Sequence, residues 1–214
     1  MHIHIPDGLL PIWLWLSGYL ITIIFLLAVL PRIRKEIKKI PLAGMVTAVA
    51  LLIMSVPLGL PIHLNLMVLI GILVGAHWSL IVALALNFIL ASFGHGGLTV
   101  IGLNTLVLWF QAIAGIFLFK SFIKIFKNYF ASASLAAFIS LAVSFLFFIG
   151  IIIVASTEPA EFLHSHEQIG HTEISLKTLL TLSLPIALFG ILTESLVTGF
   201  IVQFIKKVKP DLIV

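Results

Sequence analysis

The sequence contains no cysteine and few charged residues, and both absences narrow the class of protein. Without cysteine the chain can form neither a disulfide bond nor a thiolate metal site. Charged residues make up 9% of the 214 positions, whereas hydrophobic residues make up 61%. A soluble domain of this size cannot bury so much apolar surface, so the composition predicts an integral, all-α membrane protein surrounded by lipid. We expect a single transmembrane domain over residues 1–214.

Two missing sequence patterns exclude further classes. The chain has no G-x-x-x-x-G-K-[ST] phosphate loop, so it cannot itself hydrolyse ATP in the usual way. No basic segment precedes the first apolar run, which argues against a signal peptide. The net charge of +4 does not indicate a nucleic-acid partner, because the basic residues are grouped beside apolar runs.

Apolar runs mark the expected membrane spans, since a helix needs about 20 residues to cross about 30 Å of hydrocarbon. The stretch 63–93 is long for one helix and short for two ordinary ones, and "GAHWS" at 75–79 offers a tight turn between two short helices. The other spans are clear. They begin at Pro11, at Pro41 and near residue 100, and cover roughly 130–155 and 175–205.

The distribution of basic residues decides between these alternatives. Basic groups beside membrane spans favour the cytoplasmic side. If 63–93 forms two helices, there are seven spans, the N-terminus is outside, and three basic groups share the inner face. If it forms one helix, the middle group falls outside. We therefore predict seven transmembrane helices with the N-terminus outside. The three groups hold eleven of the twelve basic residues: Arg32, Arg34, Lys35, Lys38 and Lys39; Lys120, Lys124 and Lys127; Lys206, Lys207 and Lys209.

This topology also sorts the eight histidines, of which only His77 falls inside. Imidazoles and carboxylates together are ligands for divalent transition metals. The outer loop at 157–175 carries four glutamates and three histidines, and for these three histidines alone we favour a solvated role. The seven outer histidines are His2, His4, His63, His95, His164, His166 and His171.

The amino terminus has the composition of a planar chelate. The Met1 amine, the His2 backbone amide and the His2 Nδ1 atom can close a five-membered and a six-membered ring around one ion. Three nitrogens then lie in a plane, with one position open. Such a field suits Ni(II) and Cu(II) and disfavours Zn(II), which prefers tetrahedral sites.

The fourth ligand predicted is His63, placed in the first turn of the short third helix, within an apolar tract. His4 could replace His2, bind axially or donate a hydrogen bond. His95 lies in the glycine-rich "SFGHGGL", which is either a lid or an ordinary outer turn. Glu194 is an acid inside the last span, where it pairs with interior groups or serves coupling.

We expect supporting roles for three further polar residues and for one residue in a turn. Asn87, Asn104 and Gln111 are candidates for buried hydrogen bonds to metal ligands or between helices. Asp7 is expected to shape the turn into the first helix rather than to bind the ion.

Three stretches resemble a known family, the CbiM/NikM membrane subunits of cobalt and nickel energy-coupling factor (ECF) transporters. "HIPDGLLP" is similar to the family's opening. The central stretch from "SVPLGLPIHLN" to "GLTVIGLNTL" and the closing "ALFGILTESLVTGFIVQFIKKVKPDL" also resemble it, whereas residues 128–175 contain no matching motif.

The resemblance implies a substrate-binding subunit of an importer in a prokaryotic cell membrane, in some members linked to cobalamin biosynthesis. It implies a six-helix substrate-binding (S-component) bundle with an added N-terminal helix. The ligands would be the terminal amine and amide, the second-residue histidine, and the histidine that corresponds to His63. Two ATPase subunits and a transmembrane coupling subunit, with a small accessory membrane subunit in some systems, would be the partners. Ni(II) or Co(II) would be the substrate, with no organic cofactor.

The sequence departs from the family at three points. An extra Met-His precedes the opening motif, so the family histidine corresponds to His4 by motif and to His2 by chain end. His95 stands where the family often has Asp. The turn before His63 reads "LGLPI" rather than being rich in Gly and Ser.

The sequence leaves two alternatives to a transport subunit, which itself would not be an enzyme. A membrane metalloenzyme of zinc type lacks an H-E-x-x-H helix here. A self-sufficient channel or secondary transporter would need carboxylates along its spans, and Glu194 alone lies there.

Overall fold

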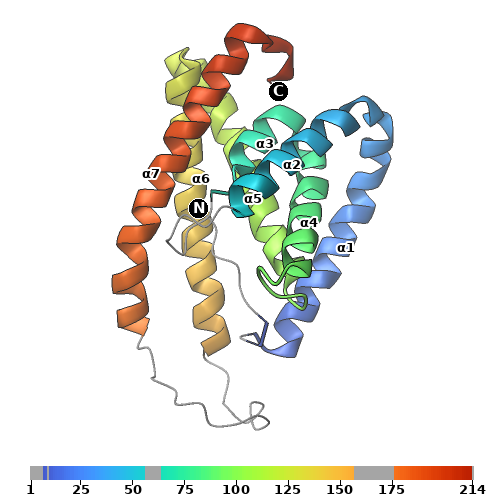
Figure 1. Cartoon of the computed structure of the whole chain (residues 1–214), viewed down its shortest axis with the longest axis vertical. Coiled ribbons are helices and arrows are strands. Elements are labelled where there is room, and N and C mark those ends of the chain that lie inside the picture. The colour runs from blue at the N-terminus through green and yellow to red at the C-terminus, as the bar shows by residue number, and fades with distance from the viewer. Residues whose placement is uncertain (1–6, 9, 56–63, 157–175, 214) are drawn as a thin grey trace.

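The computed structural model describes residues 7–8, 10–55, 64–156 and 176–213, and every regular element in this part of the chain is a helix. The predicted all-α class is confirmed (Figure 1). The α-helices of the described residues are α1 (Ile12–Lys35), α2 (Ile40–Ser55), α3 (Met67–Val74), α4 (Ala76–Ser92), α5 (Ile101–Phe126), α6 (Tyr129–Ser156) and α7 (Leu176–Val208), with short 3-10 turns η1 (Ile37–Lys39) and η3 (Pro210–Leu212).

Several of the described connections between the helices lie at the two ends of the bundle. Figure 1 shows the α1–α2 corner, the α5–α6 corner and the C-terminus at the upper end of the bundle. These corners carry the three basic groups, so the predicted orientation places this inner end in the cytoplasm. The opposite, outer end carries the start of α1 and the loop between α4 and α5.

The stretch 63–93 contains two helices, as the charge pattern predicted. The break is shorter than the predicted turn at 75–79, because Gly75 alone separates α3 from α4. Gly75 has φ 86° and ψ 170°, a backbone conformation that an L-residue with a Cβ atom rarely adopts. His77 lies in the first turn of α4, three residues after Val74, whose carbonyl accepts a hydrogen bond from Lys39.

Helix α3 is too short to span a membrane. Its eight residues measure about 12 Å at 1.5 Å per residue, against about 30 Å of hydrocarbon. Among the described residues, five helical stretches are long and apolar enough to cross, and α4 with 17 residues is slightly shorter. The prediction of two short helices over 63–93 is therefore confirmed, although α3 is too short to cross the hydrocarbon by itself.

The predicted start of the third helix is wrong. The sequence predicts a start at about residue 63, whereas α3 begins at Met67 and the preceding residues 64–66 are not helical. Leu66 has φ 54°, in the left-handed region, and the side chain of Asn65 accepts a hydrogen bond from the Met67 N–H at 2.9 Å. Local capping therefore delays the helix by one turn. His63 itself lies outside the described residues.

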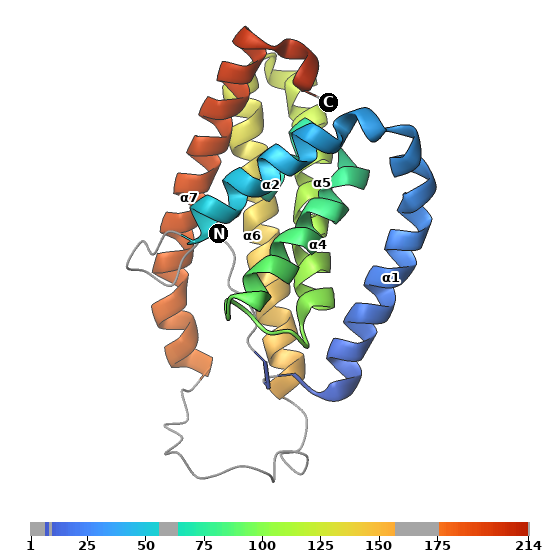
Figure 2. The same ribbon diagram turned by 45° about the vertical axis from the view of Figure 1, so that its right-hand side comes forward.

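Small residues let α3 and α1 approach α5 closely. A Cβ atom at Gly115 of α5 would lie 2.5 Å from Val68 of α3, and one at Gly102 would lie 2.6 Å from the Tyr19 backbone of α1. The Thr22 hydroxyl also donates to the Gly102 carbonyl at 2.8 Å. Figure 2 shows α1 at the edge of the bundle, as expected for a helix added to a six-helix core.

Candidate metal-binding site

The predicted ligands fall mostly on parts of the chain that the structure does not describe. Met1, His2, His4 and His63 lie outside the described residues, and their assignment stays a prediction. His95 is described: it lies with an exposed side chain in the α4–α5 loop at the outer end. Its N–H donates to the Leu90 carbonyl at 2.9 Å, which closes the end of α4.

The same loop holds the start of the chain through Asp7. One carboxylate oxygen accepts the Leu98 N–H at 2.9 Å, and the other accepts the Thr99 N–H at 2.9 Å and the Thr99 hydroxyl. Asp7 therefore does more than shape a turn: it fixes the chain directly after the predicted chelate to the α4–α5 loop. We name these contacts among Asp7, Leu98 and Thr99 the Asp7 clamp.

A glycine makes room for the Asp7 clamp. A Cβ atom at Gly97 would lie 2.2 Å from the Asp7 Oδ1 atom and 2.6 Å from the Asp7 backbone nitrogen, so any side chain there would force the chain at Asp7 to shift. The Tyr19 hydroxyl of α1 donates to the Leu98 carbonyl and ties the loop to the first span. Asp7 thus meets a backbone surface that only glycine leaves open, two residues after His95.

Hydrogen bonding keeps Asp7 ionised. The Thr99 hydroxyl, helped by the backbone N–H groups of Thr99 and Leu98, lowers the pKa of Asp7 below its ordinary value of 3.8, against a smaller opposing effect of burial. At neutral pH the carboxylate accepts all three bonds.

A second polar cluster lies at mid-depth. Glu194 stands near the middle of α7 and Gln111 near the middle of α5, and both contact the start of α3. The two Glu194 oxygens accept the Asn65 N–H at 3.3 Å and the Leu66 N–H at 2.9 Å. Sequence reasoning singled out Glu194 and Gln111 but missed Asn65, which joins them. A signal was present, since asparagine ahead of an apolar run is typical of a helix start.

Two buried asparagines lie nearer the outer end. Asn87 of α4 and Asn104 of α5 are 3% and 2% exposed, which confirms their predicted burial. Asn87 donates to the Ala83 carbonyl at 2.9 Å and to Thr105 at 3.4 Å. The Oδ1 atoms of both asparagines accept no hydrogen bond from any group in the described part of the chain. They are acceptors suited to orient an amine or imidazole N–H.

Within residues 7–8, 10–55, 64–156 and 176–213, no three His, Asp or Glu side chains gather closely enough to hold an ion. The two carboxylates at the clusters above are engaged with backbone N–H groups. Four of the predicted ligands, Met1, His2, His4 and His63, lie outside these ranges.

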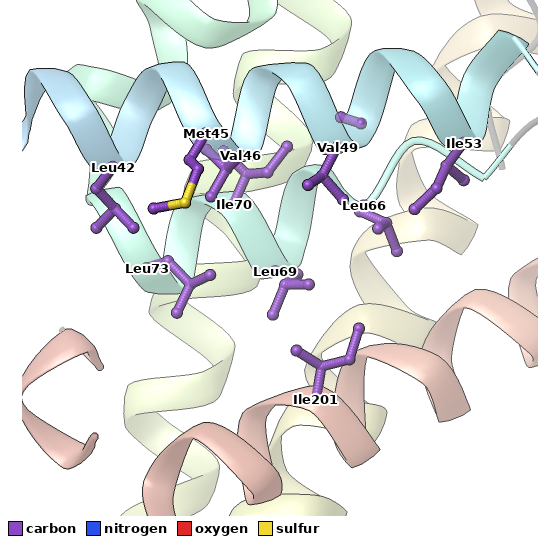
Figure 3. Close-up of a pocket in the computed structure, with 11 residues that line it drawn as sticks. Leu42, Met45, Val46, Val49, Ile53, Leu66, Leu69, Ile70, Leu73 and Ile201 are labelled. Atoms are coloured by element: carbon purple, nitrogen blue, oxygen red, sulfur yellow. The ribbon is translucent and has the colours of Figure 1, made fainter. Parts of the chain in front are cut away.

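The groove in Figure 3 is not suited to an ion. It has a volume of about 230 Å³, lies between α2, α3 and α7, and is lined by apolar side chains alone. A cation there would meet no donor atom. Its lining residues are Leu42, Met45, Val46, Val49, Ala50, Ile53, Leu66, Leu69, Ile70, Leu73 and Ile201.

Helices long enough to cross a membrane, with basic corners at one end and polar residues buried between the helices, define a multi-pass membrane protein. The family described as the cobalt uptake substrate-specific transmembrane region, CbiM, matches residues 4–212. The chain belongs to this family and is a membrane component of metal uptake.

Comparisons with individual proteins agree with the family. A provisionally named metal transport protein, MJ1569 of Methanocaldococcus jannaschii, is 29% identical over 233 residues, which cover 98% of this chain and 94% of the relative. Two solved structures share the fold at 18% identity. A truncated transition metal transporter matches with TM-score 0.72 over 95% of this chain and 98% of its own, and a transition metal transporter matches with TM-score 0.74 over 96% and 93%.

Proposed function

We propose that this chain is the substrate-binding membrane subunit of an ATP-driven importer for Ni(II) or Co(II), located in a prokaryotic cell membrane. It captures the ion at the outer face with the amino terminus and His63. The Asp7 clamp carries the proposal, since it anchors the chain six residues after Met1 to the outer α4–α5 loop.

The donor set supports nickel or cobalt as substrate. An amine, a deprotonated amide and two imidazoles supply four nitrogens, a field that late divalent transition metals prefer over magnesium or calcium. The family match over residues 4–212 supports cobalt uptake, and nickel uses the same nitrogen ligands.

Energy must come from other subunits, because the sequence has no phosphate loop. We propose two ATPase subunits and a transmembrane coupling subunit as partners, with a small accessory membrane subunit in addition. The basic inner end of the bundle faces the compartment in which ATP is available.

The test is metal binding by the purified chain with a native amino terminus and a C-terminal tag. Equilibrium dialysis against equimolar Ni(II), Co(II) and Zn(II) should give one ion per chain, with Ni(II) or Co(II) preferred. Uptake into cells should require co-expressed ATPase and coupling subunits. Preference for Zn(II), or uptake by the chain alone, would contradict the proposal.

Loss of the Asp7 clamp should weaken capture. Asp7→Asn replaces one acceptor oxygen by an NH₂ group that faces a backbone N–H. Losing a group that positions metal ligands without binding the ion costs about 10- to 100-fold in metal affinity. We expect a loss in that range by dialysis. Asp211→Asn in η3, at the inner end, is the matched control and should have no effect. Equal affinity in both variants would show that the clamp does not support the site.

The Asp7 clamp and the metal ligands should respond to acid at different pH values. Because the folded pKa of Asp7 lies below its ordinary 3.8, the clamp's contribution to stability is present above that value and is lost as pH falls through the lowered pKa. Histidine side chains take up protons at about pH 6.5, and a protonated imidazole cannot bind the ion. Between about pH 4 and 6, metal should therefore dissociate while the Leu98 and Thr99 amides stay protected from hydrogen exchange.

A further inference from the structure

The amino end of α3 lies at mid-depth in the bundle, where non-helical backbone is costly. Asn65 is 0% exposed and Leu66 is 3% exposed, and neither is helical. In hydrocarbon, such backbone persists only where protein groups satisfy its N–H and C=O atoms. The contacts made at this point therefore decide where the chain enters α3.

Glu194 supplies the acceptors for these N–H groups. It is itself 0% exposed, and its two oxygens accept the Asn65 N–H at 3.3 Å and the Leu66 N–H at 2.9 Å. A negative charge at the positive end of a helix dipole is stabilised, and hydrogen bonds to a carboxylate are stronger than neutral ones. Both effects offset the cost of burying the charge.

Asn65 is held from a second side by α5. Its Nδ2 donates to the Gln111 Oε1 at 3.2 Å, and the Gln111 Nε2 donates back to the Asn65 Oδ1 at 3.0 Å. Two long helices, α5 and α7, thus fix one residue through both its backbone and its side chain.

The opposite end of α3 is fixed by a charge of opposite sign. The Lys39 ammonium donates to the Val74 carbonyl at 3.1 Å and pairs with Glu36 at 3.0 Å. A cation at the carboxyl end and an anion at the amino end both complement the dipole of this eight-residue helix. The position of α3 along the membrane normal is therefore set at both ends.

We propose that Glu194 is a positioning residue for metal capture: it fixes Asn65 and Leu66, and through them the position from which the chain leads back to His63, two residues earlier. Glu194 acts on the backbone of α3 rather than as a ligand. This inference rests on the proposed function, in which His63 is a ligand.

To hold Asn65 and Leu66, the side chain at position 194 must be long enough to reach both N–H groups and must present two acceptor oxygens. Glu194→Gln keeps the length but turns one oxygen into an NH₂ group against a backbone N–H. Glu194→Asp keeps the charge but is one methylene shorter. Each variant should bind Ni(II) or Co(II) at least about tenfold more weakly than the wild type, as for losses of groups that orient ligands. Each should also speed amide exchange at Asn65 and Leu66.

Ser195→Ala is the matched control, because Ser195 is a buried neighbour on α7 whose hydroxyl donates to the Ile191 carbonyl of the same helix. It should change neither affinity nor exchange. A merely structural role of Glu194 would lower the melting temperature of the metal-free variants but leave the increase on metal addition at its wild-type size. The positioning role reduces that increase as well.

The outcomes distinguish the two proposals. A wild type that binds neither ion overturns the proposed function and with it the role of Glu194. A wild type that binds, with Glu194→Gln and Glu194→Asp retaining its affinity, overturns only the role of Glu194. Weaker binding without faster exchange at Asn65 and Leu66 would make Glu194 a direct ligand and also overturn the positioning role.

Discussion

Adding a single residue ahead of Met1 is expected to lower the affinity for Ni(II) or Co(II) by more than about 100-fold, beyond the losses found for groups outside the coordination shell. The added residue converts the terminal amine into an amide. An amide nitrogen is a poor donor until it loses its proton, and the five-membered ring to the His2 amide can no longer form around the same ion. Acetylation of the amine should have the same effect.

The fold should survive this change. The groups that form the Asp7 clamp and the packing of α1 on α5 are other than the terminal amine. The melting temperature without metal should match that of the wild type. The control is the same residue added after Val214, at the far end of the chain. An extended amino terminus with unchanged affinity would exclude the amine as a ligand.

The number of helices could be predicted because it depends on local composition. The grouping of eleven basic residues distinguished two helices from one over 63–93, and Gly75 supplies the break. Burial of Asn87, Asn104 and Gln111 followed from polar residues in apolar runs, since such side chains avoid lipid.

The boundaries at the candidate site could not be predicted, because the groups that set them are distant in sequence. The start of α3 depends on Glu194, which is 129 positions away from Asn65. The conformation of the chain at Asp7 depends on Leu98, 91 positions away. Periodicity and local capping patterns carry no information on contacts at such separations. The glutamate was recognised as costly, whereas its partner became evident only in three dimensions.

The histidine substitutions should separate ligands from surface residues. His2→Ala and His63→Ala each remove one of four donors from a planar site, so each should cost more than about 100-fold in affinity. His164→Ala and His171→Ala remove imidazoles that at most raise the local ion concentration, and their effects should be small. Equal losses at all four positions, measured by the same dialysis, would indicate a diffuse surface cluster instead.

His2 rather than His4 should be the imidazole in the plane. If His4 occupied the plane while the terminal amine stayed bound, the intervening amides would supply too many donors for four positions, and His63 would have no place. With His2, the amine, one amide and one imidazole leave a single vacancy for His63. His4 then lies near the axis or orients a ligand through a hydrogen bond. The visible absorption of the Ni(II) complex tests this, because a square-planar band should vanish in His2→Ala and persist in His4→Ala. The reverse pattern would assign the ligand by the family motif, which places the histidine at position 4 directly before "IPDG".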